Sequence, residues 1–265
     1  MGILRRADIN RAIAKAPPRI KQFLSEAFNA ESGELTFDQR AGQYRDGSGK
    51  LASSIYLQEF VALARGGLSN RLEQATERLL NGRISLREWE RIFAEELKDH
   101  HLIMLLFAFG GIELLQRNPS ARALFTQTGE NTRGELLGLS IFAAAIASGL
   151  RTAGQILGYS RYKANSVRGA FERSRQSALI GVGYNEARRS LDPTARHCAN
   201  CPAYETVDWV GIDDVVPVGH ACDCNGYCRC RVEYRFNPQR ALQTLGSATL
   251  ADAIARQKNA QDSRF

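Results

Sequence analysis

The chain has 265 residues, of which 44% are hydrophobic, and carries a formal net charge of +7. This length and apolar content exclude an intrinsically disordered chain and allow one or two domains with a sizeable core. Only six of the 35 basic residues are lysines, and arginine favours two-point contacts with phosphates, carboxylates and protein interfaces. A genome that encodes arginine in place of lysine would give the same excess, so composition alone identifies no partner.

The N-terminal segment gives no sign of export. It is basic and polar, and lacks the apolar core of about 7–15 residues that a secretion signal contains. We therefore expect the chain to begin its life in a cytoplasm. Two uncharged stretches, 102–112 and 136–150, are shorter than the roughly 20 residues of a membrane-spanning helix. We interpret both as buried helices, with membrane insertion as the alternative.

Residues 1–50 predict a helix followed by an extended arm. Ile20, Phe23 and Ala27 recur at helical spacing. Residues 32–50 contain four glycines and little apolar periodicity, which indicates an extended loop. Because a loop of that length is seldom kept in a compact domain without a function, we expect the arm to lie against a neighbour.

Residues 51–196 predict a multi-helix body. The first helix covers about 53–81, is weakened by two adjacent glycines, and is closed by Gly82. The second begins at Ser85, which with Glu88 fits a capping box in which each side chain satisfies a backbone donor. It continues into the first apolar stretch and stops at Gly110 and Gly111. Further helices are predicted at 135–147 and at about 152–191.

The strongest charge asymmetry lies between residues 151 and 196. This range contains nine basic and only three acidic residues. Such an excess would suit a helix lying along DNA or an acidic protein surface. A solvated face without a partner is the alternative. The basic residues are Arg151, Arg161, Lys163, Arg168, Arg173, Arg175, Arg188, Arg189 and Arg196.

All six cysteines fall within residues 198–230, as C-x2-C, twenty intervening residues, and C-x-C-x3-C-x-C. A C-x2-C turn points two thiolates at one ion, and a second cluster completes a tetrahedral set. A structural zinc site is the first interpretation, because a reducing cytoplasm disfavours disulfides. Disulfides and free or redox-active thiols are the alternatives. His197 or His220 could replace one sulfur ligand.

The second cysteine cluster continues into a predicted strand. From 228 to 236, cysteines and apolar residues alternate with arginines and a glutamate, the period of a half-buried strand. The sulfurs of Cys228 and Cys230 would face inward. Residues 209–218 would pair with this strand across a turn near Gly219. The polar tail that follows has one short amphipathic piece and predicts no fixed structure.

No enzyme motif accompanies these features. The sequence contains no His-Glu-x-x-His pair, no Gly-x4-Gly-Lys-Ser/Thr loop and no Gly-x-Ser-x-Gly elbow. The adjacent His100 and His101 would point to different faces of a helix, which favours packing over a shared metal. We therefore expect no enzymatic activity.

The cysteine segment resembles the C-terminal ends of tailed-phage minor head proteins, also called head morphogenesis proteins. The likeness covers about forty residues and rests on the C-x2-C, Trp209, Pro217, Gly219 and a final Cys-Arg-Cys. Gly226 and Tyr227 depart from the His-x-Asn-Cys-Arg-Cys ending usual in the family. The resemblance implies a metal set of Cys198, Cys201, Cys228 and Cys230, with Cys224 as the substitute.

The resemblance also implies a role. It is that of a low-copy virion component that acts in capsid assembly in the host cytoplasm, near portal proteins or packaged DNA. We expect a homo-oligomer or multi-copy assembly, with capsid or portal proteins as partners and no membrane. The alternative is a DNA-binding zinc-knuckle protein that uses the basic run 151–196; a membrane-active ejection component is a third hypothesis, based on 136–150 alone.

The expected fold is mainly α, with an extended N-terminal arm and a small C-terminal Cys-rich β-ribbon or zinc knuckle. Four segments follow from the patterns. They are 1–50 (helix and arm), 51–196 (helical body), 197–236 (knuckle) and 237–265 (tail).

Overall fold

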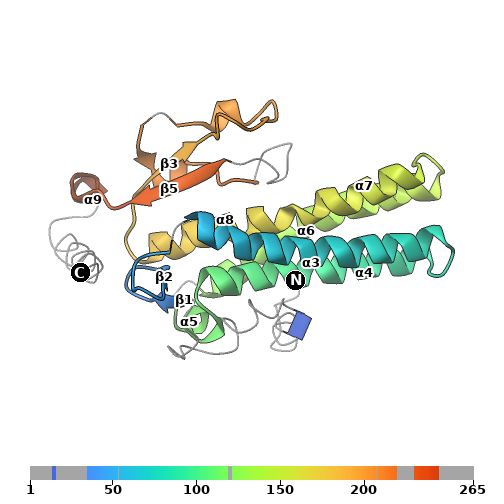
Figure 1. The fold of residues 1–265 in the computed structure, drawn as a ribbon, viewed down its shortest axis with the longest axis horizontal. Helices are drawn as coiled ribbons and strands as arrows, with labels where there is room; N and C mark the ends of the chain where they lie inside the picture. The colour runs from blue at the N-terminus through green and yellow to red at the C-terminus, as the bar shows by residue number, and fades with distance from the viewer. Residues whose placement is uncertain are drawn as a thin grey trace.

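The structure, a computed structural model, describes residues 14–15, 35–52, 54–118, 121–206, 208–219 and 230–244. Long helices run side by side along the long axis of the molecule, and a small sheet lies against one end of this bundle (Figure 1). The predicted mainly helical fold with a small β element is confirmed. The helix predicted within 19–30 and the tail after 244 lie outside the described residues.

Helices α3 (Ser54–Leu80) and α4 (Leu86–Ala108) form an antiparallel pair. The turn between them uses Gly82 at φ 68°, where a residue without a Cβ is favoured. Ser85 caps α4 by accepting a hydrogen bond from the Glu88 amide at 3.1 Å, which confirms the serine half of the predicted capping box. Both helix boundaries follow the sequence closely because glycine and the cap act locally.

Five more helices are described, of which the last follows the sheet in the chain and lies beside it (Figure 1). They are α5 (Ile112–Arg117), α6 (Ala121–Ala147), α7 (Ala153–Ala164), α8 (Ser166–Gly181) and α9 (Pro238–Thr244). A capping box formed by Thr152 and Gln155 starts α7. The prediction of one helix over 152–191 is wrong. Asn165 separates α7 from α8, α8 ends before Gly183 at φ 98°, and a strand follows.

The predicted extended arm is a β-hairpin. Strands β1 (Leu35–Asp38) and β2 (Gln43–Asp46) pair in antiparallel fashion, and the Asp38 carboxylate accepts hydrogen bonds from the Arg40 and Ala41 amides in the turn. The hairpin packs on the chain's own bundle, since the buried Tyr44 hydroxyl donates to the Phe107 carbonyl at 2.7 Å. The neighbour that the arm contacts is therefore α4.

A three-stranded antiparallel sheet has the order β4-β3-β5, where β3 is Glu186–Ser190, β4 is Val210–Gly211 and β5 is Arg231–Arg235. The predicted pairing of 209–218 with 228–236 is wrong, because β3 lies between them and pairs with both. The predicted alternation of β5 is confirmed, with Val232 buried and Arg231 exposed. The sheet thus includes a segment from the range assigned to the helical body.

Two hydrophobic cores correspond to these two parts. The larger lies between the helices and includes Trp89, Phe93 and all of 102–109, so the first apolar stretch is buried as predicted. The smaller lies under the sheet and contains Cys201 and Cys230. The second apolar stretch is only partly buried, because α6 exposes Leu137 and Ile141 at 65% each.

Of the helices described, none has both the length and the apolar character needed to cross a membrane.

Candidate metal centre

The first half of the candidate site is a tight turn. The Cys201 amide donates to the Cys198 carbonyl at 3.2 Å, and the 3₁₀ turn Pro202–Tyr204 follows at once. This conformation turns both side chains to the same side, with the two Sγ atoms 3.3 Å apart. The C-x2-C spacing therefore places its two sulfurs on the same side of the turn, as the sequence predicted.

The second half comes from the residue that precedes β5. Cys230 is fully buried, and its Sγ lies 3.7 Å from the Cys201 Sγ. Its backbone carbonyl accepts a hydrogen bond from the Arg168 guanidinium of α8. Pairing of β5 with β3 places Cys230 in the small core, and the Arg168 contact ties it to the bundle.

His197 completes the group. Its Nδ1 lies 3.8 Å from the Cys230 Sγ, and its Nε2 is 2.7 Å from the Asp192 carbonyl. Because a carbonyl can only accept, Nε2 carries a proton, so in the neutral imidazole the lone pair is on Nδ1, the atom nearer to the Cys230 Sγ. A backbone carbonyl that fixes the imidazole tautomer in this way is a common outer partner of metal-ligating histidines.

The spacing of these atoms fits one small metal ion. The ligand atoms of His197, Cys201 and Cys230 all lie within 4.8 Å of one another. Two sulfurs at about 2.3 Å from one tetrahedral zinc ion would be about 3.8 Å apart, close to the observed 3.7 Å. A disulfide would need about 2.05 Å, much shorter than the 3.3 Å between the Cys198 and Cys201 sulfurs or the 3.7 Å between those of Cys201 and Cys230. The group could hold a metal ion.

A buried arginine sets the electrostatics of the site. The Arg189 guanidinium, fully buried, lies 3.8 Å from the Cys201 Sγ, donates to the Val216 carbonyl at 2.9 Å and sits over the Tyr204 ring. A cation beside a thiol favours the thiolate that binds metals. Arg189 was predicted as part of a basic helix. The signal that could have placed it here is the pair Gly181 and Gly183, which ends α8 early.

Of the predicted ligands, the structure brings Cys201 and Cys230 into one group with His197, which was considered only as a replacement. The Cys198 Sγ lies 3.3 Å from that of Cys201 but does not belong to this group of three. Cys224 and Cys228 lie outside the described residues, as do Cys222 and His220.

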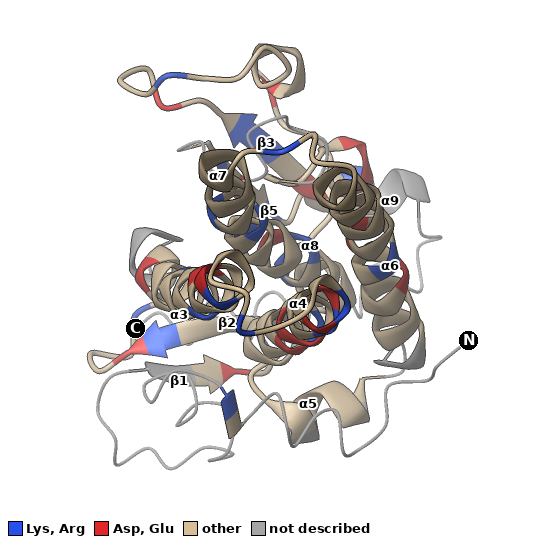
Figure 2. Ribbon diagram, turned by 90° about the vertical axis from the view of Figure 1, so that its right-hand side faces the viewer, with Lys and Arg blue, Asp and Glu red and all other residues tan. Residues whose placement is uncertain are grey.

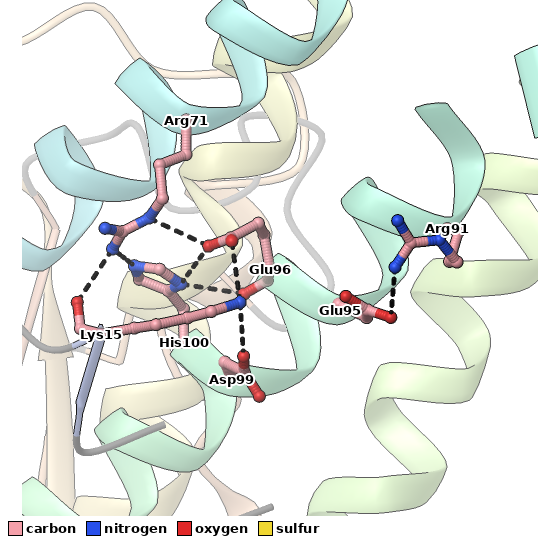
Figure 3. Close-up of polar contacts among 7 residues, drawn as sticks. All are labelled: Lys15, Arg71, Arg91, Glu95, Glu96, Asp99 and His100. Carbon is pink, nitrogen blue, oxygen red and sulfur yellow. Dashed lines mark hydrogen bonds and ion pairs between the residues drawn. The ribbon is translucent and has the colours of Figure 1, made fainter. Parts of the chain in front are cut away.

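A second group of ionisable residues surrounds Glu96 of α4 and also includes residues from other segments (Figure 3). Lys15 makes ion pairs with Glu96 and Asp99 at 2.9 Å each, and Arg71 pairs with Glu96 at 2.9 Å. His100, fully buried, donates from Nδ1 to the Glu96 carbonyl at 2.8 Å and accepts at Nε2 from the Arg71 guanidinium at 3.0 Å. Because both carboxylates are already neutralised by cations, this group acts as an internal ion-pair network. The packing predicted for the two histidines is confirmed, with both in the core.

The basic run 151–196 is spread over several elements. The run covers α7, α8 and β3, and basic and acidic residues are interleaved over the molecule (Figure 2). Lys163 pairs with Glu135 of α6, Arg188 with Glu233 of β5, and Arg161 with Glu73 of α3. Several of these cations therefore link elements of the same chain.

No family model, curated protein or solved structure matches the chain.

Proposed function

We propose that this chain is a non-enzymatic structural protein of a tailed-phage particle, a minor head or head morphogenesis protein whose C-terminal module is stapled by zinc. The observation that carries the metal part is the buried convergence of His197, Cys201 and Cys230. The virion part rests on the resemblance of the cysteine segment to minor head proteins. Two of the three ligands are fully buried, which favours a structural over a catalytic metal, since a catalytic site keeps an open position.

The proposed ligands are His197 Nδ1 and the sulfurs of Cys201 and Cys230, with Cys198 in the fourth place. Cys198 is the candidate because it shares the C-x2-C turn with Cys201, and its Sγ, now 3.3 Å from that of Cys201, would have to move to about 3.8 Å for both to bind one tetrahedral zinc ion. Cys228 and Cys224 remain the competing predictions for that place. When bound, zinc would supply a rigid cross-link between the C-x2-C turn and the start of β5.

The small core of the C-terminal module explains why it would need a metal cross-link. Among the described residues its core holds nine buried residues, two of them cysteines, and a small core seldom stabilises a fold without a metal or disulfide. Contacts with α8 hold the module against the bundle, namely Arg168 to the Cys230 carbonyl and Gln176 to the Ile212 carbonyl. Loss of the metal should therefore loosen the sheet and leave the helices folded.

The two tryptophans allow this to be tested part by part. Trp89 lies in the helical core, whereas Trp209 lies against Arg188 and Arg235 of the sheet. In a Trp89→Phe variant, Trp209 is the only tryptophan left. A zinc chelator should shift its fluorescence and leave the helical circular dichroism almost unchanged. Unchanged Trp209 fluorescence in protein shown by elemental analysis to have lost its metal would contradict the proposal.

The native metal and thiol content decides between zinc and disulfides. Elemental analysis should find about one zinc per chain. Protein with no zinc and no titratable thiols would overturn the metal assignment and favour a disulfide-linked ribbon.

A multi-copy role needs a surface for self-association, and we propose the outer face of α6. Leu137 and Ile141 are 65% exposed there, and the exposed Ser140 and Ala144 beside them are small enough for a second helix to approach closely. The proposed occupant is the same face of a second copy, as in an isologous contact.

The virion assignment is tested on particles. Mass spectrometry of phage particles purified from a host that carries the gene should detect the chain at low copy number, together with portal and capsid proteins. Its absence from purified particles would overturn the assignment.

The second candidate, DNA binding through residues 151–196, gains less support. Lys163 and Arg189 are buried, and Arg188 and Arg161 are ion-paired within the chain, so fewer cations are available to phosphates than the charge count predicts. Purified protein that bound DNA with a steep salt dependence would favour this candidate.

A further inference from the structure

A small polar cavity lies where α4, α6 and α8 meet, away from the cysteine cluster. It is lined by His101 and Leu105 of α4, by Leu124, Gln127, Thr128 and Asn131 of α6, and by Ala170, Arg173, Ser174 and Ser177 of α8. Its volume is about 10 Å³, which is the scale of one water molecule or one monatomic ion.

The polar part of the lining combines one cation, Arg173, with neutral side chains that can donate or accept. The guanidinium of Arg173, the side-chain amides of Gln127 and Asn131, and the hydroxyl of Ser174 all border the cavity. Among the described residues, no Asp or Glu lines it. The Thr128 carbonyl, an acceptor on the same helix, already receives a hydrogen bond from Thr132 at 2.8 Å. A guanidinium that can only donate, surrounded by amides and hydroxyls that can turn an N–H or O–H toward a ligand, suits a negatively charged ligand.

Arg173 has no carboxylate partner among the described residues. Burial lowers the pKa of its guanidinium. The charge of Glu135 raises the pKa of Arg173, and the Glu135 carboxylate forms an ion pair with Lys163. His101 is neutral, because burial lowers its pKa to about 3, and both of its ring nitrogens contact hydroxyl groups, of Thr132 and Ser166. Arg173, Lys163 and Glu135 together leave one uncompensated positive charge in this part of the bundle.

Arg173 is largely but not fully withdrawn from solvent, and a bound counter-ion lowers the cost of a cation in such a place. We propose that this cavity is a binding site for one monatomic inorganic anion, of which chloride is the natural representative, with Arg173 as the countercharge. The volume excludes phosphate, sulfate and organic carboxylates. The site would join α6 to α8 through a shared ion, and it does not depend on the proposed virion role.

Bromide provides a direct test because it replaces chloride and scatters X-rays anomalously. Crystals of the full-length protein grown in sodium bromide should show an anomalous peak in the cavity, within hydrogen-bond reach of Arg173. A cavity without bromide, or with water alone, overturns the proposal.

Thermal unfolding gives a second test in solution. At constant ionic strength, replacing sodium gluconate by sodium chloride should raise the Tm by about 2–4 °C, because a ligand that binds only the folded state stabilises it. Gluconate is too large for the cavity. The Arg173→Met variant should lose this chloride dependence, whereas Arg196→Met, which removes an exposed arginine, should keep it.

Equal chloride dependence in wild type and Arg173→Met would also overturn the proposal. If Arg173→Met fails to fold, Gln127→Leu serves in its place, because Gln127 is exposed and its replacement removes one donor with little effect on packing. Its chloride-induced Tm shift should be smaller than that of the wild type, and an undiminished shift would count against the site.

Discussion

His100 and His101 show how burial decides what a residue does. Burial lowers the pKa of His100 to about 4 and that of His101 to about 3, so both stay neutral in the folded chain at neutral pH. In the unfolded chain both take up protons below about pH 6.5. The unfolded state then binds more protons, and the free energy of unfolding falls as the pH falls from about 6.5 to 4.

The pH dependence is therefore the first prediction. Each buried histidine should contribute a slope of about 1.4 kcal/mol per pH unit in that window. The His101→Gln variant should have a shallower slope than the wild type in denaturant titrations between pH 7 and 4.5. Metal loss at low pH lowers the free energy of unfolding of both proteins, so comparing wild type with the variant at each pH cancels that contribution. Identical slopes would show that His101 does not titrate as its burial requires.

Lys15 carries a second prediction at this scale. Its ammonium group pairs with Glu96 and with Asp99, whose side chain is fully buried. Lys15→Met should lower the free energy of unfolding by about 2–4 kcal/mol, because an unpaired buried carboxylate remains. The double variant Lys15→Met, Asp99→Asn should recover part of that loss. No recovery would mean that the lysine acts through packing of its alkyl chain.

At the scale of elements, two helical glycines have opposite roles. A Cβ at Gly169 of α8 would lie 2.8 Å from the Gly219 carbonyl oxygen and 3.2 Å from the Arg173 Nη1. A Cβ at Gly158 of α7 would meet nothing within 4 Å. The first glycine therefore permits the sheet module to approach α8, and the second only lowers helix propensity.

The expected outcomes differ in sign. Gly169→Ala should destabilise the protein by about 1–3 kcal/mol, because backbone must shift to relieve the overlap. Gly158→Ala should stabilise it by about 0.5–1 kcal/mol. Equilibrium unfolding in urea measures both. A stabilising Gly169→Ala would show that the module does not pack on α8 at this distance.

Contacts between elements also lead to a prediction about which cysteines bind zinc. Cys230→Ser should abolish zinc binding and reproduce the chelator effect on Trp209, because Cys230 joins β5 to the C-x2-C turn. Cys198→Ser should weaken zinc binding by a smaller factor if another residue can take the fourth place. Competition with a chromophoric chelator measures both affinities. Full retention of zinc by Cys230→Ser would contradict the proposed ligand set.

At the scale of the whole molecule, the exposed face of α6 predicts self-association. Ile141→Glu should lower the average mass measured by analytical ultracentrifugation towards that of a monomer, because a charge would be buried in the proposed contact. Leu80→Glu, at the far end of α3 and 39% exposed, is the matched control and should leave the mass unchanged. A monomeric wild type would remove the basis for this surface.

Local signals in the sequence were enough for the helical body. Gly82 and the Ser85 cap mark the boundary between α3 and α4, and the uncharged 102–109 is buried as its composition indicates. Such features act over a few residues, so they can be recognised without knowing what packs against them. The C-x2-C turn belongs to the same class, since its geometry is set within four residues.

The tertiary structure decided what depends on distant partners. Glu186–Ser190 has no strong strand pattern and becomes a strand because β4 and β5 pair with it on both sides. His197 joins the cysteines through β5, thirty-three residues away. Arg173 and Arg189 look alike in sequence, yet one lines a polar cavity and the other lies beside a sulfur. Sequence determined which residues could bury, turn or ligate; only packing determined which of them meet, because pairing across a fold depends on contacts that no local pattern encodes.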